Sequence, residues 1–186
     1  TVAKDSSPAT TAAAGSRDNT PVVLTGSADG TVTYGNDSVT VDASHTEEGY
    51  LMVSYSGSNS KVKLQITGSD EITYTYNLHD GYETFPLTSG SGSYTVGVFE
   101  NIEGTSYSTL FTQAIDVTIQ DEFGPYLYAN QYVNFSADSK VISKAMELSA
   151  SANDDLEVIE NIYNYIITNF TYDYDKAASV QSGYLP

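Results

Sequence analysis

From residue 22 to about residue 120, apolar and polar positions along the chain alternate with a period of two. The alternating segments are Val39–Val41, Leu51–Tyr55, Val62–Ile66, Ile72–Tyr76, Tyr94–Val98 and Ile115–Ile119. Such alternation places every second side chain on a buried face and the others towards water, which is typical of β-strands. The pattern therefore predicts a succession of short strands, each buried on one side.

Stretches rich in Gly, Asn, Asp and Ser separate these segments, such as Gly35-Asn36-Asp37 and His79-Asp80-Gly81. These residue types favour turns. Short strands separated by such turns indicate an antiparallel sandwich. We expect residues 22–120 to form an immunoglobulin-like or fibronectin-like β-sandwich, so that the protein is mainly β. The run Ser89-Gly90-Ser91-Gly92 is expected to be the exposed loop between two long strands of one hairpin.

After residue 120 the period changes from two to that of a helix. Residues 121–135 are expected to be a connector, because Pro125 has no N–H to give to a sheet. Residues 136–186 are then expected to contain two α-helices. The first is predicted to begin at Ser136 or Asp138, with Ser136 as its N-cap, and the second after Asn153 as N-cap.

The second predicted helix has a wide stripe of apolar residues along one side. The stripe consists of Leu156, Ile159, Ile162, Tyr163, Ile166, Ile167 and Phe170. A stripe of this width must face another surface. We expect the helix to be partly exposed, docked on the sandwich, or buried in a homo-oligomer through this face. If uncovered, the stripe is an interaction surface or an aggregation liability.

The first 21 residues have a different composition from the remainder. They are rich in Thr, Ser and Ala and contain no Leu, Ile, Phe or Tyr. Burial of such a segment cannot offset the entropy lost on ordering it. Residues 1–21 are therefore expected to be a disordered spacer of an exported, extracellular or cell-surface protein whose leader has been removed. The alternative is that this end is an arbitrary boundary.

The charge and the cysteine count exclude several classes of function. With 24 acidic and 7 basic residues the net charge is −17, which repels nucleic acid and anionic membranes. The chain has no cysteine, so it contains neither disulfides nor thiolate metal sites. No apolar run approaches the roughly 18 residues of a membrane-spanning helix. No nucleic acid partner and no membrane insertion are therefore expected.

No catalytic, metal-binding or cofactor-binding residue is assigned from the sequence. His45 and His79 have no partners at metal-ligand spacing and are expected to be surface loop residues. Paired carboxylates occur at Glu47-Glu48, Asp70-Glu71, Asp121-Glu122, Asp154-Asp155 and Asp173 with Asp175. They suit either loose calcium binding or solubility, and none forms an EF-hand loop. Exposed tyrosines suit either sugar stacking or simple strand positions.

Residues 136–186 resemble the incomplete helical start of bacterial transglutaminase-like domains, which are papain-like with a Cys-His-Asp triad, and two runs near the C-terminus match this family. They are Asn169-Phe170-Thr171-Tyr172-Asp173 and Gly183-Tyr184-Leu185-Pro186. In that family the first run ends a helix, and a Gly-x-Cys nucleophile follows shortly after the second. Phe85–Thr88, Gly92–Val96 and Pro125–Val133 are similar to the accessory domain and linker of secreted members from Gram-positive gut bacteria.

The resemblance implies the N-terminal portion of a secreted cysteine enzyme acting on amide or peptide bonds, truncated before its catalytic cysteine. In this chemistry the thiolate is the nucleophile. Since the chain has no cysteine, it is expected to be an inert accessory sandwich with entry helices. The protein or cell-wall substrate would bind through the missing catalytic domain. The alternative is a cell-surface adhesion or binding module with an immunoglobulin-like fold and no enzymatic activity, whose helical tail mediates assembly.

Overall fold

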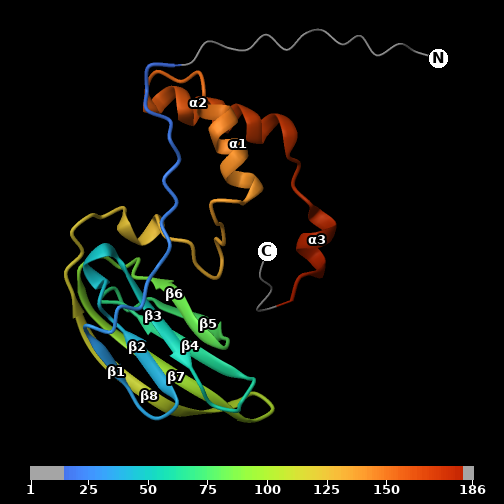
Figure 1. Cartoon of the computed structure of the whole chain (residues 1–186). Coiled ribbons are helices and arrows are strands. Elements are labelled where there is room, and N and C mark those ends of the chain that lie inside the picture. The colour runs from blue at the N-terminus through green and yellow to red at the C-terminus, as the bar shows by residue number, and fades with distance from the viewer. Residues whose placement is uncertain (1–14, 182–186) are drawn as a thin grey trace. The chain divides into compact units, whose positions relative to one another are not determined.

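The computed structural model describes residues 15–181 (Figure 1). The chain divides into two compact units. The helical unit combines residues 15–22 with Phe135–Ser179, and the β unit contains Val23–Asn134 with residues 180–181. Among the described residues, no helix has both the length and the apolar character needed to cross a membrane.

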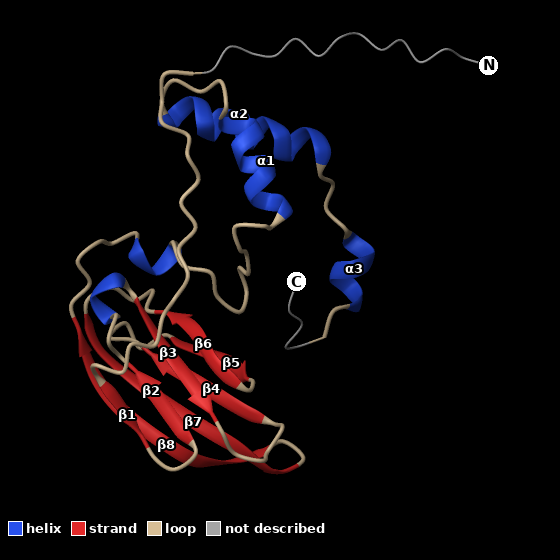
Figure 2. Ribbon diagram, in the orientation of Figure 1, coloured by secondary structure: helices blue, strands red, loops and turns tan. Residues whose placement is uncertain are grey.

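The β unit consists of two four-stranded antiparallel sheets, drawn in red in Figure 2. The first sheet has the order β1 (Thr33–Gly35), β2 (Val39–Asp42), β3 (Tyr50–Tyr55) and β6 (Gly81–Pro86). The second has the order β5 (Thr73–Leu78), β4 (Val62–Thr67), β7 (Gly92–Glu103) and β8 (Ser106–Val117). The prediction of a mainly β protein with antiparallel strands is confirmed.

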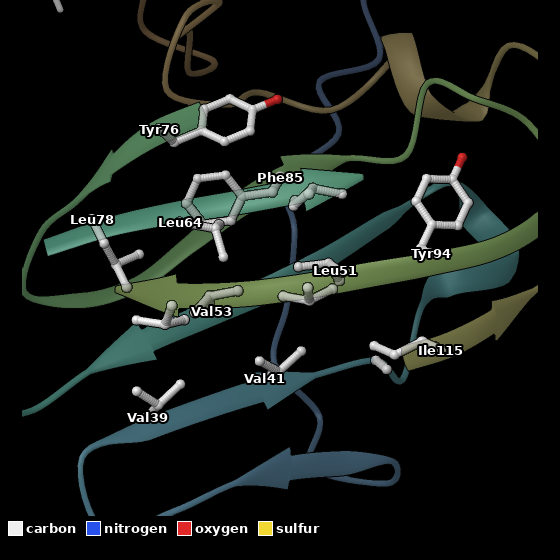
Figure 3. Close-up of a cluster of buried hydrophobic side chains, with 14 of the residues drawn as sticks. Val39, Val41, Leu51, Val53, Leu64, Tyr76, Leu78, Phe85, Tyr94 and Ile115 are labelled. Atoms are coloured by element: carbon white, nitrogen blue, oxygen red, sulfur yellow. The ribbon is translucent and has the colours of Figure 1, made fainter. Parts of the chain in front are cut away.

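The inward-facing residues of both sheets form one hydrophobic core (Figure 3). Alternation is clearest in β4, where Val62, Leu64 and Ile66 are buried and the residues between them are half-buried. Phe85 of β6 is fully buried, and its ring meets that of Tyr76 edge-on at 5.0 Å between centroids. Each fully buried aliphatic or aromatic side chain contributes about 1.5–3 kcal/mol. Most of the apolar positions of the alternating segments therefore belong to the core.

The loop Ser89–Gly92 does not join two paired strands, so that prediction is wrong. It links β6 and β7, which lie in different sheets, and the chain crosses between the sheets here. Tyr94 anchors the crossing: its hydroxyl lies 3.0 Å from the Leu87 carbonyl oxygen and 2.8 Å from that of Gly90. Turn residues mark where a strand ends, but they do not tell which sheet receives the next strand.

The helical unit contains three helices, one more than the sequence analysis predicted. They are α1 (Lys140–Ser149), α2 (Asp155–Asn169) and the short α3 (Tyr174–Ser179). The additional helix α3 has only six residues, too few to show an apolar period. Its first turn is held by the Asp173 carboxylate, which accepts a hydrogen bond from the Lys176 N–H at 2.8 Å.

Both predicted N-caps are displaced. Helix α1 begins after Ser139 rather than Ser136, whose N–H donates to the Ser139 hydroxyl oxygen at 2.8 Å. Helix α2 is capped by Asp154, whose carboxylate accepts from the Glu157 N–H at 2.9 Å. Asn153 instead donates its N–H to the Glu157 carboxylate at 2.7 Å. Asp154 is the cap because its backbone is extended there, which aims its short side chain at the first turn.

The spacer predicted over residues 1–21 is described only from residue 15 onwards. Residues 1–14 lie outside the described part of the chain. The Gly15 N–H donates to the Ala150 carbonyl at 3.0 Å, and the Ser16 N–H donates to Asn153 Oδ1 at 3.1 Å. Arg17 forms an ion pair with Asp155 at 2.7 Å. The end of this segment is thus attached to the connection between α1 and α2.

Candidate functional site

Helix α2 packs against α1 through one side only. Val158, Ile162 and Tyr165 are half-buried and recur at the spacing of a single helix face. On the same side, the Asn161 side-chain amide donates to the Leu148 carbonyl of α1 at 2.9 Å. The Lys144 ammonium of α1 lies 5.1 Å from the centre of the Tyr165 ring. This side of α2 is therefore occupied within the helical unit.

The other side of α2 is apolar and exposed. Its residues are Leu156, Ile159, Tyr163, Ile166, Ile167 and Phe170, with exposed fractions between 49% and 75%. We call these residues the apolar face. Of the stripe predicted from the sequence, only Ile162 belongs to the packed side. An exposed apolar face of this kind is either a candidate interaction surface or an aggregation liability.

The run Asn169–Asp173 lies directly at the end of this helix. Helix α2 stops at Asn169, and Phe170 has an extended backbone. The Phe170 ring meets the Tyr165 ring edge-on at 5.8 Å between centroids. The second run of the resemblance, Gly183–Pro186, lies outside the described residues. The Asn169–Asp173 run of the resemblance is thus a helix end next to the apolar face.

His45 is half-buried and has partners that the sequence analysis missed. Its Nε2 lies 2.9 Å from Asp29 Oδ2, and its Nδ1 lies 3.2 Å from Glu48 Oε1. The Tyr128 hydroxyl donates to the other oxygen of Glu48. The Tyr50 ring stacks on the His45 ring and contacts the Tyr128 ring. Only the His45–Glu48 spacing of three residues was visible in the sequence, because Asp29 and Tyr128 come from distant segments.

Ser27, His45 and Glu48 are arranged in the order of a Ser-His-acid triad, with Ser27 Oγ 3.2 Å from His45 Nε2. Asp29 lies closer to that same nitrogen, at 2.9 Å. The carboxylate at each ring nitrogen favours the protonated imidazole. In that form His45 cannot accept the proton of Ser27, which is the step that a triad requires. The geometry therefore favours a structural ion-pair cluster over a catalytic triad.

The pKa values in this cluster are displaced in opposite directions. Burial of His45 lowers its pKa, but the hydrogen bonds and charges of Glu48 and Asp29 outweigh this and raise it. The pKa of Glu48 is lowered, chiefly by the hydrogen bond from Tyr128 and despite partial burial. Burial raises the pKa of Asp42, but hydrogen bonds from Ser44 and Gly30 outweigh burial, so that the pKa is lowered overall. The charged forms of all three groups are therefore favoured by folding.

These shifts predict a maximum of stability between about pH 5 and pH 6.5. The His45 contribution is complete below the ordinary histidine pKa and disappears as the pH rises through the raised value. The Glu48 and Asp42 contributions are complete above the ordinary carboxyl pKa and disappear as the pH falls. For a partly exposed ion pair, we expect the His45 contribution to be about 1 kcal/mol or less. Urea unfolding of wild type and His45→Gln at about pH 6 and pH 8.5 measures it.

The difference in stability between wild type and His45→Gln should shrink from about pH 6 to pH 8.5. His79→Gln is the matched control, because His79 also lies beside a carboxylate, 3.1 Å from Glu83, but its side chain is 56% exposed. The prediction would be contradicted if both variants lost the pH dependence of stability equally, or if neither variant lost it.

Several of the paired carboxylates have structural partners. Glu47 accepts a hydrogen bond from the Gln120 side chain at 2.7 Å, and Asp155 pairs with Arg17. Asp70 accepts from the Ile72 N–H at 3.1 Å. Within the described residues, no group of three or more His, Cys, Asp or Glu side chains is placed to hold a metal ion.

Sequence comparisons do not assign the chain to a family. A scan against protein-family models finds no match, and a search of curated proteins finds no similar sequence. The features that bear on function are therefore those of the chain itself, the apolar face of α2 and the two-sheet β unit.

Proposed function

We propose that the chain is the non-catalytic accessory sandwich and entry helices of an exported bacterial transglutaminase-like cysteine enzyme. In this proposal the enzyme acts on amide or peptide bonds of a protein or cell-wall substrate, outside the cell or at its surface. The part described here provides no nucleophile, because it contains no cysteine. Its contribution is to support and position the catalytic domain.

The observation that supports this proposal is the apolar face of α2. The helix is already packed on α1 through its opposite side, so the apolar face is additional to the core of the helical unit. Helices that are apolar on both sides normally lie inside a larger core. The face also directly precedes the Asn169–Asp173 run, on which the family resemblance partly depends. In the proposal, the rest of the catalytic domain covers it.

An immunoglobulin-like or fibronectin-like classification of the β unit forms part of the proposal. Its support is the strand order, in which the chain passes repeatedly between two antiparallel sheets. Further support comes from Tyr94, near the start of β7, whose hydroxyl bonds to backbone carbonyls a few residues upstream. That arrangement corresponds to the tyrosine corner of immunoglobulin-like sandwiches. The short strand β1 is an addition at the sheet edge.

The gene sequence beyond codon 186 tests the proposal. We expect it to encode a Gly-x-Cys helix start soon after Pro186, followed by His and Asp. The longer protein should hydrolyse or transfer acyl groups at amide bonds, and a Cys→Ala variant should lose this activity. A stop codon directly after Pro186, or a second sandwich in that place, would overturn it. The binding-module alternative would then remain, and a cavity in the β unit favours it.

A further inference from the structure

An open cavity of about 480 Å³ lies where the chain leaves β8 for the connector. Its wall is formed by the β6–β7 loop and by the segment from Ile119 to Tyr126, which includes the 3₁₀ helix η2 (Gly124–Tyr126). The volume is within the range of sites for small ligands or single side chains. Among the described residues that line it, none is Lys, Arg or His.

Two aromatic rings beside this cavity are exposed. Phe123 directly precedes η2 and Tyr126 is its last residue; they are three residues apart, so they lie on the same side of this 3₁₀ turn. Their exposed fractions are 63% and 66%. Each ring presents a face with negative electrostatic potential to solvent, which is a favourable surface for a cation.

The backbone that holds these rings is fixed by close contacts with the sandwich. The Ile119 N–H donates to the Ser91 hydroxyl at 2.9 Å, and the Gln120 N–H donates to the Glu47 carbonyl at 2.9 Å. Gly124 lies so close to the Glu48 backbone that a Cβ would stand 2.4 Å from its carbonyl oxygen. The site is therefore formed before any ligand binds, which lowers the ordering cost of binding.

The charges of the cavity select the ligand class. Asp121 and Glu122 are exposed and contribute to its lining. The Asp121 carboxylate accepts a hydrogen bond from the Phe123 N–H at 2.9 Å, and Glu122 makes no ion pair within the described part of the chain. Carboxylates and aromatic faces both attract ammonium and guanidinium groups. The net charge of −17 repels anions and attracts cations over a longer range.

We propose that this cavity binds the cationic side chain of a lysine- or arginine-containing peptide segment. The ring faces of Phe123 and Tyr126 contact the cation and its aliphatic stem, and Asp121 and Glu122 accept its hydrogen bonds. A neutral sugar would also stack on the rings and donate hydroxyl hydrogen bonds to the carboxylates, but the net charge of the chain would not attract it. This inference goes beyond the proposed enzyme function and does not depend on it.

Calorimetric titration of the whole chain with pentalysine tests the proposal. We expect saturable binding that weakens with added salt. Both Phe123→Ala and Glu122→Gln should weaken it by about tenfold, which corresponds to the loss of one cation–π contact or one charged hydrogen bond. Tyr82→Ala and Glu103→Gln are the matched controls, since they remove an exposed ring and an exposed carboxylate outside the cavity. Their affinities should stay within about twofold of wild type.

Three results would overturn the proposal. Equal binding of pentalysine acetylated on every side-chain nitrogen would show that the cation is not recognised. Equal losses in the control variants would show that the attraction comes from the overall charge. Binding of cellohexaose that is lost in Phe123→Ala, without binding of pentalysine, would assign the cavity to carbohydrate. Circular dichroism of each variant verifies that it is folded.

Discussion

Replacing Ile159 and Ile166 by Asp is expected to abolish self-association of this chain. Both residues belong to the apolar face, and they are seven residues apart on one side of α2. In the proposed enzyme this face is covered by the catalytic domain. When the chain is studied alone, a second copy of the chain is the simplest surface that can bury the apolar face. Each isoleucine buried in such a contact contributes about 1.5–3 kcal/mol, so the double variant should weaken association by at least a hundredfold.

Sedimentation velocity over a range of protein concentrations measures this effect. Wild type should show a concentration-dependent oligomer, whereas Ile159→Asp/Ile166→Asp should remain a monomer with unchanged helix content. The matched control is Asn164→Asp/Thr168→Asp, which adds charge to exposed positions of α2 outside the apolar face. It should associate as wild type does. A wild type that is monomeric at every concentration would contradict the prediction, and so would an associating double variant.

Ile162→Asp should behave differently from the two changes on the apolar face. Ile162 is half-buried on the side of α2 that packs against α1. A carboxylate there loses water without gaining a partner. We therefore expect lower helix content and a lower melting temperature, rather than a soluble monomer with intact helices. Unchanged helix content in this variant would show that the packed side of α2 is assigned wrongly.

Replacing Tyr94 by Phe is expected to lower the free energy of unfolding by about 1–3 kcal/mol. The ring stays in the core, but the carbonyl oxygens of Leu87 and Gly90 lose their shared hydroxyl donor. These carbonyls belong to the loop in which the chain crosses from one sheet to the other. Because burial raises the pKa of Tyr94, this effect should persist over the neutral pH range. Urea unfolding of both proteins at neutral pH measures it.

Tyr76→Phe is the control for this change. Tyr76 is also buried in the core, and burial raises its pKa to about 12, but its hydroxyl makes no hydrogen bond within the described structure. We expect its removal to change the free energy of unfolding by less than about 0.5 kcal/mol. Equal effects of the two substitutions would contradict a stabilising role for the Tyr94 hydroxyl.

Local sequence patterns predicted which residues share a face, but not how far that face is covered. The alternation Ile72, Tyr74, Tyr76 correctly indicates one side of a strand. Yet Ile72 and Tyr74 are exposed, and burial begins only at Tyr76. Strand β5 lies at one edge of its sheet, and the core covers only part of its length. A period of two contains no information on the position of a strand within a sheet.

The sequence by itself determined the strand-rich region, the helical region and the apolar residues of α2, because these follow from short-range periodicity and residue type. Only the tertiary structure decided that Ile162 packs while Ile159 and Ile166 remain exposed. It also decided that Asp29 and Tyr128 meet the His45–Glu48 pair, and that Ser89–Gly92 joins different sheets. The physical reason is that these contacts join residues far apart in the chain. Their proximity depends on strand order and chain crossings, which no local pattern of polarity records.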